Sequence, residues 1–161
     1  MLIRLAERAD LPAINAIFNH YVLHSTCTLE EDLVSEAERD AWFELQRGSY
    51  PATVALIGDE VVGWASLSKY RSRCAYRFTL ENSIYVREDR RRRGIGGALL
   101  EDLIDRAREL EVHSIVAGIE SSQEGSIALH EQHGFVTTAH LREVGFKFRQ
   151  WLDVVFMQRM M

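Results

Sequence analysis

The most informative segment of this sequence is Val86-Arg87-Glu88-Asp89-Arg90-Arg91-Arg92-Arg93-Gly94-Ile95-Gly96-Gly97-Ala98-Leu99-Leu100. An alternating apolar run ends at Val86, four consecutive arginines follow, and a helical pattern of apolar residues begins after the glycines. A strand, a basic glycine-rich turn and a helix in this order are typical of a pyrophosphate site. Glycines let the backbone approach the phosphates, and the N–H groups and dipole at a helix start favour negative charge. The sequence therefore predicts a phosphate-bearing cofactor at this turn.

Three kinds of phosphate-binding loop can be compared with this turn. A P-loop requires Lys-Ser or Lys-Thr after its glycines, and neither follows Gly96. A dinucleotide fingerprint requires a further glycine where Leu99 stands, and it belongs after the first strand of a βαβ unit. The spacing Arg91-x-x-Gly94-x-Gly96 matches a third pattern, Gln/Arg-x-x-Gly-x-Gly/Ala. The simpler alternative is an arginine-rich, solvated turn before an ordinary helix.

The composition is that of an ordinary globular protein. The chain has 161 residues, of which 47% are hydrophobic and 27% are charged, and we expect one domain over residues 1–161. The net charge of −5 argues against a nucleic-acid partner, so the cluster Arg87–Arg93 has a local purpose.

The cysteines and the apolar segments indicate a reduced compartment. Cys27 and Cys74 form no disulfide framework and no metal-ligand spacing, so we expect two buried, inert thiols and no metal site. No run is apolar enough to span a bilayer, and the N-terminus lacks the apolar segment of a signal peptide. We therefore expect a cytoplasmic protein with no membrane partner.

Periodicity predicts alternating strands and helices. Asp10 and Pro12 mark the start of the first helix, Ser35 caps the second, and Gly134 ends the fourth. Strands are expected at residues 2–5, 53–57, 61–67, 84–86, 113–119, 135–141 and 152–158, and helices from residue 11, at 35–47, at 95–110 and at 126–133. The order β-α-α-β-β-β-α-β-α-β-β predicts an α/β fold with a mixed central sheet flanked by helices.

This order, with the glycine loop between the fourth strand and the third helix, resembles the GNAT N-acetyltransferase superfamily, whose Gln/Arg-x-x-Gly-x-Gly/Ala signature binds acetyl-CoA. The run Ser126–Phe135 resembles the late segment of that superfamily, which ends in Leu-Tyr-x-x-x-Gly-Phe. Within it the chain resembles the phosphinothricin acetyltransferase branch, which includes enzymes acting on methionine sulfone and sulfoximine. The matching motifs are Asn19-His20-Tyr21, Arg73-Cys74-Ala75-Tyr76, Glu81-Asn82-Ser83-Ile84-Tyr85-Val86, His130-Glu131, Val144-Gly145-Phe146-Lys147 and Trp151-Leu152-Asp153.

The resemblance implies where acetyl-CoA binds. The loop Arg92–Gly97 would hold the diphosphate, and the backbone of the fourth strand would pair with the pantetheine arm, with the Val86 N–H facing the acetyl carbonyl. Gln123 stands where close relatives carry an asparagine that contacts this arm. The residues expected to bind the cofactor are Ile84, Tyr85, Val86, Arg91, Arg92, Arg93, Gly94, Ile95, Gly96, Gly97 and Gln123.

Two residues are candidates for the proton transfers. An α-amino group has a pKa of about 7.7–8, so much of an amine acceptor arrives protonated and needs a base. Glu81, five residues before Val86, is that candidate; the alternative is a solvated glutamate at the start of a strand. His130 stands where many GNAT enzymes have a tyrosine thought to protonate the CoA thiolate. The alternative for His130 is a packing residue of a short helix.

The segment before Glu81 is rich in cations, and arginine binds a carboxylate bidentately. By resemblance this segment lines the acceptor pocket, and the alternative is an exposed basic loop. For Arg77 both interpretations stay open. Leu29 lies near positions where relatives carry aromatic residues over that pocket. The residues expected to bind the acceptor are Arg71, Ser72, Arg73, Tyr76, Glu81, Asn82 and Ser83.

Together the residues and the resemblance predict an acetyl-CoA-dependent N-acetyltransferase. It would act on the α-amine of a small amino-acid-like acceptor such as phosphinothricin, methionine sulfoximine or methionine sulfone. The amine would attack directly in a ternary complex, since no cysteine occupies a matched active-site position, although Cys74 is close in sequence. The alternatives are a protein N-terminus or a polyamine as acceptor, or a non-catalytic acetyl-CoA-sensing module. The resemblance also implies a homodimer in which residues 145–151 lie near the partner's site.

Overall fold

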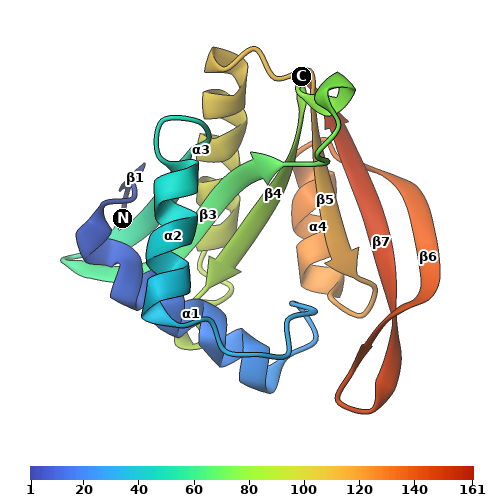
Figure 1. Cartoon of the computed structure of the whole chain (residues 1–161), viewed down its shortest axis with the longest axis horizontal. Helices are drawn as coiled ribbons and strands as arrows, with labels where there is room; N and C mark the ends of the chain where they lie inside the picture. Colours follow the sequence, from blue (N-terminus) through green and yellow to red (C-terminus); the bar gives the residue numbers. More distant parts are fainter.

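The computed structural model describes residues 1–161, and its seven strands form one sheet in the order β1-β2-β3-β4-β5-β7-β6 (Figure 1). The order of strands and helices along the chain is the predicted one, and the mixed α/β fold is confirmed. The elements are β1 (Leu2–Leu5), α1 (Leu11–His24), α2 (Glu36–Gln46), β2 (Ala52–Ile57), β3 (Glu60–Lys69), β4 (Thr79–Val86), α3 (Ile95–Glu109), β5 (Ser114–Glu120), α4 (Glu124–Gln132), β6 (Val136–Lys147) and β7 (Gln150–Met160).

The sheet separates two apolar layers. One layer joins α1 and α2 to the sheet and includes Ile14, Phe18 and Trp64. The other joins α3 to the opposite face and includes Leu80 and Leu99. Removal of these side chains from water is the main force that holds the helices on the sheet, and it fixes where the ends of α1 and α3 lie.

The two residues predicted to mark helix starts, Ser35 and Asp10, use their side chains differently. Ser35 caps α2 as predicted: its Oγ accepts from the Glu38 N–H at 3.2 Å, and the Glu38 carboxylate accepts from the Ser35 N–H at 2.8 Å. Asp10 is the N-cap residue of α1, but its carboxylate is engaged elsewhere: Arg4 donates to it at 2.6 and 2.9 Å, and the Glu7 N–H donates to it at 2.8 Å. The predicted N-cap position and the proline in the first turn of α1 are therefore confirmed, but the Asp10 side chain makes no capping hydrogen bond.

β4 and β5 run side by side for only a short distance. They pair in parallel from Thr79–Ser114 to Glu81–Val116, and no pairing continues beyond that point. β4 nevertheless runs on to Val86 and β5 to Glu120. The two strands therefore separate inside the sheet and leave a gap between their C-terminal halves.

The last two strands are longer than predicted. β6 and β7 form a hairpin that turns at Phe148 and Arg149, both with positive φ, whereas the predicted strands cover only residues 135–141 and 152–158. Non-glycine residues with positive φ give no turn signal in the sequence, and a register shift between Leu141 and Gly145 interrupts the alternation.

Smaller differences concern the ends of other elements. β4 begins at Thr79 rather than at residue 84, and α4 begins at Glu124 rather than at residue 126. Both extensions are polar, which conceals them from an apolar pattern. None of the helices has the length and hydrophobicity needed to cross a lipid bilayer.

Candidate active site

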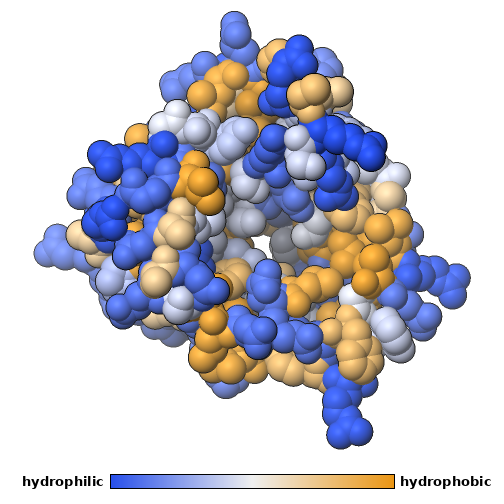
Figure 2. Space-filling view, in the orientation of Figure 1, coloured by the Kyte–Doolittle hydropathy of each residue, from blue (hydrophilic) through white to orange (hydrophobic).

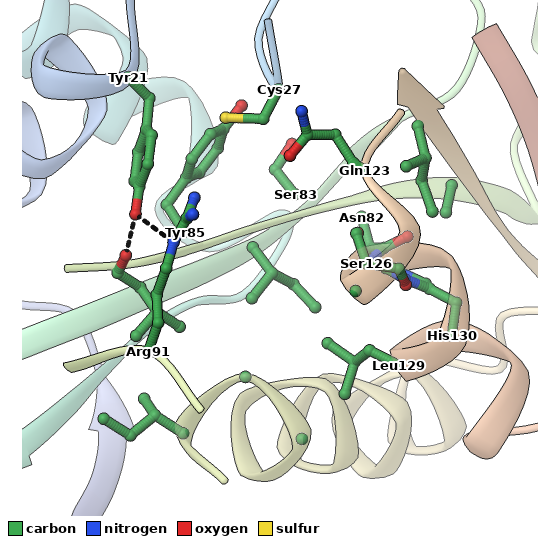
Figure 3. Close-up of a pocket in the computed structure, with 18 of the residues that line it drawn as sticks. Tyr21, Cys27, Asn82, Ser83, Tyr85, Arg91, Gln123, Ser126, Leu129 and His130 are labelled. Atoms are coloured by element: carbon green, nitrogen blue, oxygen red, sulfur yellow. Dashed lines mark hydrogen bonds between the residues drawn. The ribbon is translucent and has the colours of Figure 1, made fainter. Parts of the chain in front are cut away.

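A cavity of ≈ 470 Å³ occupies the gap between β4 and β5. Figure 2 shows the molecule hollowed at the centre of this face, and Figure 3 shows the side chains around the cavity. Its wall includes residues 82–86 of β4, 117–119 of β5, most of the turn before α3, one face of α4, and Tyr21 and Cys27 from the N-terminal part of the chain. The separation of the strands therefore creates a site that the glycine-rich turn closes at one end.

The turn has the backbone that phosphate binding requires. Gly94 lies in the left-handed region with φ 77°, and no side chain caps α3. The first backbone bond of the helix is from the Ala98 N–H to the Gly94 carbonyl at 3.1 Å, so the N–H groups of residues 95–97 have no helical acceptor. A Cβ at Gly96 would lie 3.3 Å from Leu129 of α4, so a side chain there would crowd the cavity wall. This turn therefore fits a diphosphate.

The arginines of the turn fall into two groups. Arg87 and Arg90 form ion pairs with Glu60 and Asp89. Arg91, Arg92 and Arg93 form no ion pair, so their charges are free to meet an anion. Arg91 and Arg92 line the cavity, whereas Arg93 does not. The other predicted cofactor residues of the turn, from Gly94 to Gly97, all line it.

Residues Ile84, Tyr85 and Val86 line the cavity as expected. The Tyr85 ring stacks on Trp64 with 5.0 Å between centroids, which directs it toward α1, and burial raises the pKa of its phenol. The neighbouring side chains of β4 alternate between the two faces of the sheet, so this strand contributes to the cavity from both sides.

Glu81 lies at the point where β4 and β5 part. It is the last residue of β4 that pairs with β5, opposite Val116. Its carboxylate lies over Gly118 of the cavity wall, since a Cβ placed on Gly118 would be 3.4 Å from Oε1. Burial raises the pKa of the Glu81 carboxyl, and the positive charge of Arg71 opposes this rise. Glu81 is therefore half-buried beside the cavity rather than freely solvated.

His130 projects from α4 and is only 3% exposed. Its Nδ1 lies 2.8 Å from the Ser126 carbonyl, which can only accept, so Nδ1 carries the proton. Burial lowers the pKa of His130, so the ring is neutral and Nε2 accepts from the Asn82 amide at 2.9 Å. In this state Nε2 has no proton to give to a leaving thiolate.

Gln123 stands at the N-cap of α4 and lines the cavity. Its amide donates to Thr26 Oγ1 and to Glu120, both at 3.3 Å. Burial opposes ionisation of Glu120, but hydrogen bonds from Ser122, Thr26 and Gln123 prevail and lower its pKa. An ionised Glu120 thereby holds Gln123 and the segment after α1 together.

The predicted acceptor residues do not all meet at the cavity. Asn82 and Ser83 line it. Arg71, Ser72, Arg73 and Tyr76 lie on an exposed segment between β3 and β4 and are absent from its wall. The Arg71 guanidinium stacks over the Tyr70 ring at 4.5 Å. The expectation of two buried thiols is wrong, because Cys74 is exposed and Cys27 is half-buried in the cavity wall.

The sequence alone did not reveal two contributors to this site. Tyr21 of α1 lines the cavity, and Thr26 donates to Glu120 at 2.7 Å. Tyr21 belongs to a quoted motif, but its helical spacing indicated only a core position. Thr26 lies in an irregular segment that has no periodicity to interpret.

The chain matches the family model described as "Acetyltransferase (GNAT) family" over residues 15–135. The chain belongs to this family. It is 43% identical to an L-methionine sulfoximine/L-methionine sulfone acetyltransferase of Salmonella typhimurium, over 98% of this chain and 93% of the relative. The predicted acetyl-CoA-dependent N-acetyltransferase is therefore confirmed at the level of the family.

Solved structures agree with this assignment. A phosphinothricin acetyltransferase from Sinorhizobium meliloti in complex with acetyl-CoA superposes with a TM-score of 0.97 at 41% identity, covering 99% of this GNAT chain and 88% of that one. A ribosomal-protein-alanine N-acetyltransferase from Brucella melitensis superposes with a TM-score of 0.98 at 42% identity, covering 100% of both chains. Proteins with similar structures are therefore named for different acceptors. The acceptor of this chain has to be argued from its site.

Proposed function

We propose that this GNAT chain transfers acetyl from acetyl-CoA to the α-amine of a small amino-acid-like acceptor, with methionine sulfone, methionine sulfoximine and phosphinothricin as the leading candidates. One observation carries the proposal: the half-buried Glu81 carboxylate lies where β4 and β5 separate, beside the cavity. The glycine-rich turn closes the same cavity at one end. The names of the Salmonella and Sinorhizobium relatives support this class of acceptor.

The chemistry follows from the position of Glu81. Its carboxylate takes a proton from the acceptor's ammonium group, directly or through a water, and frees the nitrogen lone pair. The amine then attacks the acetyl carbonyl carbon to form the C–N bond, and the C–S bond breaks to release the CoA thiolate. The nitrogen also gives up a second proton, which balances the proton that converts the thiolate to the thiol. The N–H of Val86, near the end of β4, is suited to stabilise the oxyanion that forms in between.

His130 is suited to carry a proton to the thiolate only after it takes one up. Its Nε2 is bare in the free protein and faces the Asn82 amide. Protonation at Nε2 during turnover would break that hydrogen bond and turn the ring into a donor. The role of His130 as the acid is therefore part of the proposal, with Asn82 as the group that it must release.

The acceptor's carboxylate requires a cation near Glu81. Arg71 is close enough to Glu81 to influence its pKa, and Arg73 follows on the same exposed segment. Neither arginine forms an ion pair, so both guanidinium groups are available to a carboxylate. We propose that this segment binds the α-carboxylate and that Ser72 and Tyr76 contribute to the same pocket.

The exposed hairpin supports the proposed homodimer. The side chains of three aromatic residues are at least half exposed: Phe146, Phe148 and Trp151. The ring centroids of Phe146 and Trp151 lie 4.9 Å apart. β6 is also an edge strand, which a second chain can cover. We propose one N-acetyltransferase domain over residues 1–161 that pairs through this hairpin in the cytoplasm; light scattering coupled to gel filtration tests the oligomeric state.

A protein N-terminus is the second candidate acceptor, because the Brucella structure carries the name of a ribosomal-protein-alanine N-acetyltransferase. CoA-thiol release distinguishes the two candidates. The acceptors would be methionine sulfone, methionine sulfoximine, phosphinothricin, common amino acids, spermidine and peptides that begin with alanine. Turnover confined to the amino-acid analogues supports the proposal, whereas turnover confined to peptides contradicts it.

A further inference from the structure

Tyr21 connects two parts of the site that are distant in the sequence. It lies near the end of α1, is 3% exposed, and separates the main cavity from a smaller hollow of ≈ 310 Å³ beside His20 and Glu88. Figure 3 shows its ring extending alongside Arg91 at one end of the main cavity. Its position places the hydroxyl between the end of β4 and the glycine-rich turn.

The hydroxyl makes two hydrogen bonds in opposite directions. It donates to the Val86 carbonyl at 2.5 Å and accepts from Arg91 Nε at 3.0 Å. The Arg91 guanidinium also lies over the Tyr21 ring, 4.9 Å from its centroid. Burial raises the pKa of the Tyr21 phenol, so the hydroxyl keeps the proton that it donates.

Each partner of this hydroxyl has a different relation to acetyl-CoA. Val86 ends the strand whose free edge borders the cavity, and Arg91 begins the Arg-x-x-Gly-x-Gly motif. Arg91 forms no ion pair, so Tyr21 is its polar partner within the protein. A further backbone bond, from the Arg87 N–H to the Val62 carbonyl at 2.8 Å, fixes the chain immediately after Val86 to β3. The strand end is therefore anchored, and Tyr21 relates the turn to it.

We propose that Tyr21 is a positioning residue for the cosubstrate, which sets the distance between the diphosphate-binding turn and the end of β4 so that both ends of acetyl-CoA bind at once. This inference rests on the proposed function for the identity of the ligand. Tyr21 acts through Arg91 and Val86 and does not touch the reacting atoms. The cost of losing it should therefore appear in cosubstrate affinity and depend on whether the ligand carries the diphosphate.

The test compares the wild type with Tyr21→Phe, which removes only the hydroxyl. Calorimetry measures Kd for CoA, which contains the diphosphate, and for pantetheine, which lacks it. We expect Kd for CoA to rise about tenfold, as the loss of a hydrogen bond to a charged group implies, and Kd for pantetheine to rise by roughly twofold or less. A CoA affinity that does not change, or equal losses for the two ligands, would overturn the proposal.

Two further variants separate positioning from a general loss of structure. Tyr50→Phe removes the hydroxyl of a tyrosine that packs against the apolar layer under α3 and lies outside the cavity wall, and it should leave both affinities unchanged. Arg91→Ala removes the guanidinium that donates to the Tyr21 hydroxyl. When Tyr21→Phe is added to Arg91→Ala, Kd for CoA should rise by less than about twofold beyond its value in Arg91→Ala. Independent, additive losses would contradict the coupling.

Turnover gives a second readout. With methionine sulfone as acceptor, Tyr21→Phe should raise KM for acetyl-CoA about tenfold and leave the acceptor KM and kcat within twofold of the wild type. A fall in kcat with unchanged KM would place Tyr21 in the chemical step and contradict a positioning role. If the wild type acetylates no amino-acid analogue, the proposed function fails, while the binding comparison still decides the role of Tyr21.

Discussion

Asn82 of β4 donates its side-chain amide to Nε2 of His130 on α4 at 2.9 Å. This bond crosses the cavity wall and holds the imidazole in the tautomer whose Nδ1–H faces the Ser126 carbonyl. The Asn82 carbonyl oxygen is itself buried without a partner. The state of the histidine is therefore governed by one neighbouring amide, and a change of that amide should change its protonation.

Replacement of Asn82 by aspartate should raise the pKa of His130. A carboxylate cannot donate to Nε2, and its charge favours the imidazolium form, which opposes the lowering that burial causes in the wild type. ¹⁵N–¹H spectra of the histidine side chains across pH 5–9 measure this change. Asn82→Ala is the matched control, since it removes the hydrogen bond without adding charge and should leave the ring neutral at pH 7. An unaltered titration in Asn82→Asp would contradict the hydrogen-bond assignment.

Replacement of Glu81 by glutamine should abolish most turnover without changing cosubstrate affinity. The amide keeps the shape of the side chain but cannot accept the ammonium proton, and loss of a general base reduces kcat by about 10²–10⁴. Steady-state kinetics with methionine sulfone measures kcat, and calorimetry measures Kd for acetyl-CoA. Glu124→Gln, on the exposed start of α4, is the control. Turnover near that of the wild type would remove Glu81 from the mechanism.

The same carboxylate should determine the acidic side of the pH profile. A base must be ionised to act, so kcat falls as the pH decreases through its pKa. Burial raises the pKa of Glu81, and this decline should therefore begin above the range of an ordinary carboxylic acid. Removing the positive charge in Arg71→Ala, which opposes the rise, should move the decline to still higher pH. A profile that is identical in the two proteins would show that Arg71 does not influence this group.

Arg71 and Arg73 provide a test of the acceptor pocket. Each replacement by alanine should raise the acceptor KM by roughly tenfold or more and leave KM for acetyl-CoA unchanged, because a charge-assisted bond to the substrate carboxylate is lost. Arg77→Ala, on the same exposed segment, is the control. Equal acceptor KM values in all three variants and in the wild type would mean that the carboxylate binds elsewhere.

The sequence could predict those parts of the site that local chemistry determines. The glycines and arginines of residues 90–97 must be contiguous to form a turn before a helix, so their spacing indicated both the phosphate site and the start of α3. The capping pair Ser35 and Glu38 is likewise a local signal. Both features depend on residues that are close in the sequence, and the structure contains the Ser35 cap and the start of α3 after Gly94.

Features that depend on long-range packing were not predictable from the same patterns. The separation of β4 from β5 after Glu81 and Val116 arises between strands joined by a whole helix, and no residue type marks it. Tyr21 shows the same limit: its position on the apolar face of α1 is consistent with a core residue, and only the fold brings its hydroxyl to Arg91. A side chain that both packs in the core and makes a hydrogen bond shows only its packing role in the periodicity of the sequence.

Lys147 should prove important for stability and for the cavity wall, although it makes no ion pair. It is 1% exposed, and its Nζ donates to the Ser25 and Thr28 carbonyls at 2.8 Å each, which ties β6 to the segment that carries Cys27. Lys147→Met keeps the apolar stem but leaves both carbonyls unpaired, so the free energy of unfolding should fall by about 2–4 kcal/mol. Urea unfolding measures this loss, with the exposed Lys69→Met as the control. Because the tethered segment borders the cavity, the acceptor KM should rise as well; a stability equal to that of the control would show that the two carbonyls find water instead.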